Sequence, residues 1–173
     1  LNVIKLESIN GELTDAQKQT TKLTAARGTF DNKANVLELF DAIDIAGETG
    51  LKAHLQRATV KTKENVITSD QPVSVAMDAG TITANSMTVR QKSKEYTFVE
   101  DVRTHLTPKP REEGATPTKS ADQAFGNSNE PVDIASKRLD INDAAKVALF
   151  TGDVKAVQGQ ATLSSPELEV TYE

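Results

Sequence analysis

The chain contains no cysteine and no tryptophan, and other aromatic residues are few. Its 173 residues include two Tyr and five Phe. Without cysteine, neither a disulfide framework nor a thiolate metal site can form, although such a composition is compatible with an oxidising compartment. A hydrophobic content of 37% with so few large rings argues against a thick globular core. A thin, elongated architecture needs less apolar material.

Positive charge is also scarce. Twenty Lys and Arg against 25 Asp and Glu give a net charge of −5, and the cations are scattered along the chain. This argues against a nucleic-acid partner. No apolar run approaches the roughly 18 residues of a membrane-spanning helix. Because the sequence begins at Leu1 within an alternating pattern, we expect a signal peptide or membrane anchor to have preceded it.

Side chains that could support catalysis do not cluster. His54 and His105 are 51 residues apart in strand-like segments, and exposed or edge positions are expected for both. No carboxylates stand at metal-ligand spacing, and no glycine-rich phosphate loop occurs. Paired acids of a glycoside hydrolase on a β-solenoid remain a minor alternative. The expected set of catalytic residues, metals and cofactors is therefore empty.

The chain does contain a hydrophobic repeat. Positions 3, 5, 11, 18 and 20 residues beyond a reference residue are hydrophobic in 17 of 20 cases over four complete units. These units start at Ala25, Leu55, Ala84 and Ser136, and a fifth starts at Ser165. A period of about 30 residues indicates stacked supersecondary units.

Within each unit, apolar residues recur two apart, which is the period of a strand with one buried face. Turn-forming residues such as Asn, Asp and Gly separate the runs. The sequence therefore predicts an all-β fold of short antiparallel strands, in a barrel, sandwich or roll, with the template positions facing inward. Residues 14–26 and 144–150 also have helix-forming composition, but their period-two flanks favour strands.

Composition divides the chain into three parts. Residues 1–106 carry most of the repeat, and residues 107–130 have the Pro, Gly and polar content of a linker. Residues 131–173 resume the pattern for about one and a half units, too little to bury an apolar face alone. We expect this last block to dock by strand pairing on an open sheet edge, either of this chain or of a second copy.

The inner apolar face is the candidate site. In a closed barrel it would be a packed core, whereas in an open roll it would be a groove for an apolar ligand. Its medium-sized side chains and few aromatics leave room for acyl chains. The candidate groove residues are Phe30, Ile43, Ile45, Val60, Val73, Val75 and Val89.

Several segments carry a family resemblance. The stretches LTAARGTFD (23–31), GLKAHLQRATV (50–60), GTITANSMTV (80–89) and YTFVEDVRTHL (96–106) resemble the periplasmic domain of LptC, a lipopolysaccharide-export protein. The stretches EPVDIASKRLDI (130–141) and VALFTGDVKAVQG (147–159) resemble the start of the partner family, LptA or the OstA-type domain, with FTGDVKAVQG the most specific piece.

The resemblance implies an open antiparallel β-jelly-roll, two sheets in a V, that is not an enzyme. It implies a periplasmic protein held at the inner membrane by an N-terminal anchor, with the acyl chains of lipid A inside the roll. The implied partners are lipopolysaccharide, an LptA-like bridge protein, the inner-membrane transporter LptBFG, and further copies joined through edge strands. No individual lipid contact is carried over, because the family's site is a surface rather than a motif.

The sequence departs from these families by joining an LptC-like roll to the opening of an LptA-like roll. It leaves open whether this is a natural fusion whose remainder is missing or an extension that completes or caps the roll. It also leaves open a self-assembling β-solenoid scaffold and, less well supported, a solenoid carbohydrate enzyme. The interior distinguishes them, because a scaffold should be packed throughout, whereas a lipid carrier needs an open groove.

Overall fold

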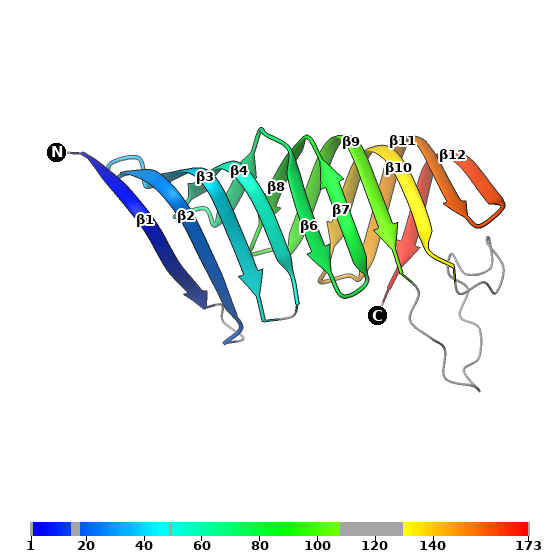
Figure 1. The fold of residues 1–173 in the computed structure, drawn as a ribbon, viewed down its shortest axis with the longest axis horizontal. Helices are drawn as coiled ribbons and strands as arrows, with labels where there is room; N and C mark the ends of the chain where they lie inside the picture. The colour runs from blue at the N-terminus through cyan, green and yellow to red at the C-terminus, as the bar shows by residue number, and fades with distance from the viewer. Residues whose placement is uncertain (1, 15–17, 49, 108–129, 173) are drawn as a thin grey trace.

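The computed structural model describes residues 2–14, 18–48, 50–107 and 130–172, and these form one antiparallel sheet (Figure 1). Within those ranges the fold is all-β, as the sequence predicts. The twelve strands are β1 Val3–Thr14, β2 Thr20–Asp31, β3 Val36–Gly47, β4 Lys52–Lys61, β5 Val66–Ser69, β6 Val73–Met77, β7 Gly80–Ala84, β8 Ser86–Arg90, β9 Glu95–Leu106, β10 Val132–Asn142, β11 Val147–Gln158 and β12 Ala161–Thr171.

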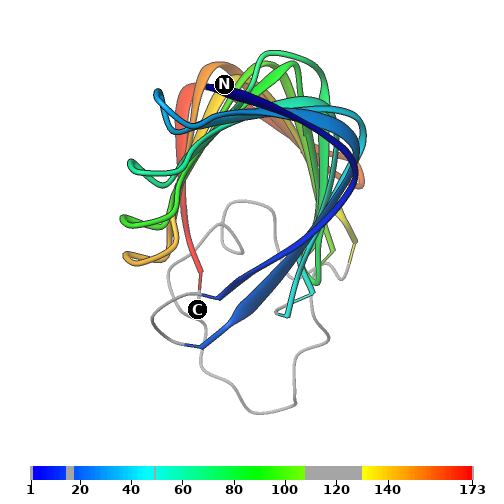
Figure 2. The same cartoon turned by 90° about the vertical axis from the view of Figure 1, so that its left-hand side faces the viewer.

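The sheet curls into an arch that is open along one side, as the end-on view in Figure 2 shows. β-Bulges make the bend. Positive φ angles occur at Asp41 and Ala42 in β3 and at Glu100 and Asp101 in β9, and the pairing register of β3 and of β9 shifts beside them. A bulge adds a residue to one strand and increases its bend. Each long strand therefore contributes to both walls, which gives the open jelly-roll expected from the sequence.

Two pairs of short strands occupy the places of long ones. β4 pairs with β5 at one end and β6 at the other, while β9 pairs with β8 and β7. Pro72 has no N–H for a ladder, and the break between β5 and β6 falls just before it. Ser69 closes the gap by donating a hydrogen bond from Oγ to the Arg57 carbonyl at 2.7 Å. The sheet stays continuous through this interruption.

The inner face carries the predicted apolar positions. Leu39, Ile43, Leu55 and Ala156 are all 0% exposed. The template positions at offsets 18 and 20 are buried in all four complete units, so the predicted inward face is correct there. The offset of 11 is wrong by one residue. Val36 pairs with Lys61 at the strand ends, whereas its neighbour Leu37 pairs with the inward Val60.

Four equivalent turns stack along one rim of the arch, and Figure 2 shows them one behind another. They span residues 32–35, 62–65, 91–94 and 143–146. The last residue of each has a left-handed backbone, with φ of 56° at Asn35, 56° at Asn65, 54° at Lys94 and 58° at Lys146. Its carbonyl accepts a hydrogen bond at 3.0–3.1 Å from the N–H of Thr62, Gln91, Asp143 and Tyr172, respectively. We call this edge the turn rim.

The C-terminal block docks on its own chain. β10 pairs with β9 from Leu106–Val132 to Glu95–Asn142, which is the cis alternative of the expected strand pairing. The turn ladder runs through this junction, since the Asp143 N–H reaches the Lys94 carbonyl. Residues 108–129, most of the predicted linker, lie outside the described residues. Of the two ambiguous stretches, residues 20–26 and 147–150 are strands, as interpreted, whereas residues 144–146 form a turn.

Candidate functional site

An apolar row runs along the inner face next to the turn rim. Cross-strand pairing joins its members over ten strands, and most are half-buried. We call it the mouth row, and its members are Ile4, Phe30, Leu37, Val60, Ile67, Val89, Tyr96, Ile141, Ala148 and Val170. It offers a continuous apolar strip at the open side of the arch.

The seven predicted groove residues fall into two groups. Phe30, Val60 and Val89 belong to the mouth row and are half-buried. The others lie at or beyond the bend, on the wall away from the turn rim, with exposures of 0–8%: Ile43, Ile45, Val73 and Val75. In the free protein this second group is packed core, so only the first group offers accessible apolar surface.

Sequence reasoning missed half of the mouth row. Leu37, Ile67 and Tyr96 come from the strand after each turn, one residue beyond the template position. The signal was present, because stepping back by twos from Leu39 or Phe98 reaches Leu37 or Tyr96. Burial raises the pKa of the Tyr96 phenol, with the Asp143 carboxylate acting in the same direction, so this ring is neutral at pH 7.

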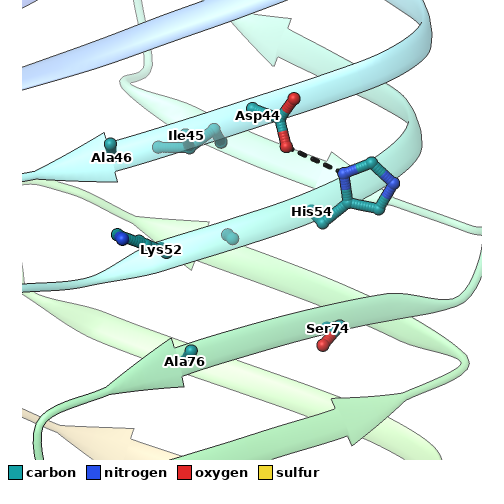
Figure 3. Close-up of a pocket in the computed structure, with 8 residues that line it drawn as sticks. Asp44, Ile45, Ala46, Lys52, His54, Ser74 and Ala76 are labelled. Carbon is teal, nitrogen blue, oxygen red and sulfur yellow. Dashed lines mark hydrogen bonds and ion pairs between the residues drawn. The ribbon is translucent and has the colours of Figure 1, made fainter.

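The outer face is polar. On it, His54 Nδ1 lies 2.8 Å from Asp44 Oδ1, in a depression of about 250 Å³ over β3, β4 and β6 (Figure 3). Ser74 is His54's pairing partner on the next strand. In Figure 3 its hydroxyl points away from the imidazole, and the site is open, so the three do not form a nucleophile–base arrangement. His105 makes a similar contact with Asp133 at 2.6 Å. Both histidines are exposed, as predicted.

A second depression, of about 480 Å³, lies on the outer face across β9, β10 and β11. Within it Asp140 accepts hydrogen bonds from Arg138 and, across the β9–β10 junction, from Thr97 at 2.9 Å. The Arg138 hydrogen bond is the main cause that holds the pKa of Asp140 below its usual value, against the opposing effect of desolvation. The carboxylate is therefore a junction contact.

No group of three or more His, Asp or Glu within the described ranges could hold a metal ion. In that part of the chain there is also no helix long and apolar enough to cross a membrane.

The two ends of the sheet are open edges. Among the described strands, β1 pairs only with β2 and β12 only with β11. On β1, Val3 and Ile4 are 49% and 50% exposed, which is unusual for large apolar side chains in this molecule. An edge strand presents unpaired backbone groups on which another strand can add.

The continuous arch, apolar inside and polar outside, is an open antiparallel β-jelly-roll. The model of the family described as "Lipopolysaccharide-assembly, LptC-related" matches residues 1–107, and the chain belongs to this family. The model of the family "LptA/(LptD N-terminal domain) LPS transport protein" matches residues 133–173. The two families occur in the order that the sequence predicts, and both indicate involvement in lipopolysaccharide transport.

The chain is similar to a curated protein named "Uncharacterized protein R00383", from Rhizobium meliloti (strain 1021). It is 42% identical to this chain over 59 residues, which cover 34% of the chain. The match spans 32% of the length of that relative. Its name states no activity, so the match shows that the two sequences are related and says nothing about function.

Proposed function

We propose that the chain is a periplasmic, non-enzymatic component of lipopolysaccharide transport that holds acyl chains at the mouth of the arch. The observation that carries the proposal is the mouth row, an apolar strip that crosses ten strands and whose members are mostly half-buried at the open side. Moving acyl chains from water onto such a surface is favourable by about 0.8 kcal/mol per buried CH₂. A packed scaffold would have no use for a continuous half-buried strip.

The depth of the predicted groove residues refines the proposal. Phe30, Val60 and Val89 contact acyl chains directly, whereas Ile43 and Val75 form the floor. The floor reaches the lipid only if the two walls separate. Because one sheet forms both walls and bends at bulges, a change of bend widens the arch without breaking the strand ladder.

The open edges supply the bridging step. In this proposal, β1 and β12 add strands of neighbouring Lpt components, an LptA-like bridge or the LptBFG transporter, or of further copies of the chain, so that the mouth rows join end to end. The cis pairing of β9 with β10 supports this reading, because it already joins the LptC-like and LptA-like parts without interrupting the mouth row. An N-terminal anchor in the inner membrane, and the division into an LptC-like and an LptA-like part, belong to the same proposal.

A site-specific crosslinking scan with lipopolysaccharide tests the function. A photo-reactive residue at Val60 or Val89 should give a lipopolysaccharide adduct. The matched controls are the adjacent outer-face residues Thr59 and Thr88, which lie in the same strands at similar depth. Equal labelling of both faces, or labelling of the outer face alone, would contradict the proposal and leave the scaffold alternative.

A further inference from the structure

The turn rim carries a repeating lysine. Lys33, Lys63 and Lys92 are each the second residue of a four-residue turn, and all three are exposed. The ladder of backbone hydrogen bonds between successive turns holds these turns in register. Successive turns are two strands apart, so the lysines follow one another at intervals of about 10 Å. The fourth turn has Ala144 in this position.

These three ammonium groups are not committed to carboxylates. No ion pair involves Lys33, Lys63 or Lys92 among the described residues, although ten other pairs are formed there. The nearby acids are engaged elsewhere. Asp31 accepts backbone N–H groups of its own turn, and Glu64 pairs with Lys61 at 3.6 Å.

Charge differs between the two rims of the arch. The four turns of the turn rim hold five Lys and two acids, a balance of +5 − 2 = +3. The short connections of the opposite rim, residues 15–19, 48–51, 78–79 and 159–160, hold Asp15, Glu48 and Asp78 against Lys18, a balance of +1 − 3 = −2. In a chain of net charge −5, the turn rim beside the mouth row therefore carries a local excess of positive charge.

We propose that the lysine row of the turn rim binds the phosphate groups of an acylated, phosphate-bearing lipid whose chains lie on the mouth row. The proposal rests on the proposed function and adds the polarity of the bound lipid. The mouth row and the lysine row run parallel along one side of the arch. The acyl chains of one amphiphile can therefore contact the mouth row while its phosphates contact the lysines. The acidic opposite rim would repel the same phosphates, which fixes the orientation of the head group.

The test compares two lipids that differ only in phosphate: lipid A with both phosphates, and the same acylated disaccharide after enzymatic dephosphorylation. The triple substitution Lys33→Glu, Lys63→Glu and Lys92→Glu should weaken binding of the phosphorylated lipid by about tenfold at low salt. Binding of the dephosphorylated lipid should stay unchanged. Lys155→Glu, an exposed lysine on the outer face with no ion-pair partner in the described structure, is the matched control and should change neither affinity.

A gain of function sharpens the test. Ala144→Lys extends the lysine row by one turn and should tighten binding of the phosphorylated lipid alone, with a steeper dependence on salt. Circular dichroism and melting temperature show that each variant is folded. If the wild-type chain binds both lipids equally, or the triple variant loses both equally, the lysine row has no phosphate role while the apolar site stands. If neither lipid binds the wild-type chain, the proposed function and this inference both fail.

Discussion

The apex and the mouth of the arch come from the same strands but bury their side chains to different depths. At the apex, Leu39 and Leu55 are 0% exposed and Phe98 is 2% exposed. In the mouth row, Phe30 and Tyr96 are half-buried, although Tyr96 is only two residues from Phe98 along β9. These buried side chains belong to the hydrophobic core cluster, whereas mouth-row side chains such as Tyr96 pack at its margin. Period-two patterning therefore fixes the face of a residue, while position relative to the bend fixes its depth.

Because of this difference in burial, the apex should mainly determine the stability of the fold, and the mouth should mainly provide the binding surface. Close packing at the apex makes each methylene count towards the free energy of unfolding. Surface that stays open at the mouth contributes less to folding and remains available to a ligand. The two regions should therefore respond differently to the same substitution.

The largest effect is expected from a charge in the buried core. Val75 is 3% exposed, so Val75→Asp places a carboxylate without a partner in the core and should cost about 5 kcal/mol or more. Ser74→Asp, one residue away on the outer face, should change stability by less than about 0.5 kcal/mol. Chemical denaturation measures both. Similar losses for the two variants would contradict the assigned faces.

Truncating an aromatic ring compares apex and mouth directly. Phe98→Ala should lower the free energy of unfolding by about 3–5 kcal/mol, because a 2% exposed ring leaves a cavity. Phe30→Ala should cost about 1 kcal/mol, since its ring is already partly in water. Lipid binding should show the opposite order and decrease in Phe30→Ala. A mouth variant as unstable as the apex variant would mean that the row is core and not a site.

Much of this architecture could be predicted from the sequence, because strand pairing keeps the two-residue period in register. The β-bulges were not predicted. The spacing of three between Ala25 and Gly28, or between Leu55 and Ala58, is odd, which breaks the two-residue alternation opposite the extra residue that β3 carries between Phe40 and Ile43. The bends and the two depths follow from those bulges, so treating all template positions as one inner face merged core with groove.

The site could be predicted only in part for the same reason. Val60 and Val89 were found from alternation alone, whereas their partners Ile67 and Tyr96 required the pairing register across each turn. The lysine row was not found, because lysines 29 and 30 residues apart look scattered until the stacked turns place them side by side.

On the rim opposite the turn rim, a substitution at a glycine that contacts backbone should lower stability more than a substitution at an exposed side chain. A Cβ added at Gly80 would lie 1.8 Å from the His105 carbonyl oxygen, and the φ of Gly80 is 149°. We expect Gly80→Ala to cost about 2–3 kcal/mol by forcing β7 away from β9. Gly11→Ala is the control, because its nearest neighbour would be 4.0 Å away. Equal melting temperatures for the two variants would show that the β7–β9 contact can relax.

The smallest effect is expected on the outer face of the β9–β10 junction. The folded-state pKa of Asp140 lies below its unfolded value of about 3.9. The ionised carboxylate therefore stabilises the fold above that pH. The contribution is lost as pH falls through the folded pKa. Asp140→Asn should therefore cost less than about 1 kcal/mol at pH 7, discounted for its partial exposure. Urea unfolding at pH 7 and below pH 3 should show the difference from wild type shrinking at acid pH.

Asp70→Asn, an exposed acid with no ion-pair partner among the described residues, should show no difference at either pH. A difference for Asp140→Asn that persists below pH 3 would point to the Thr97 hydrogen bond, and not the charge, as the contact that holds the junction.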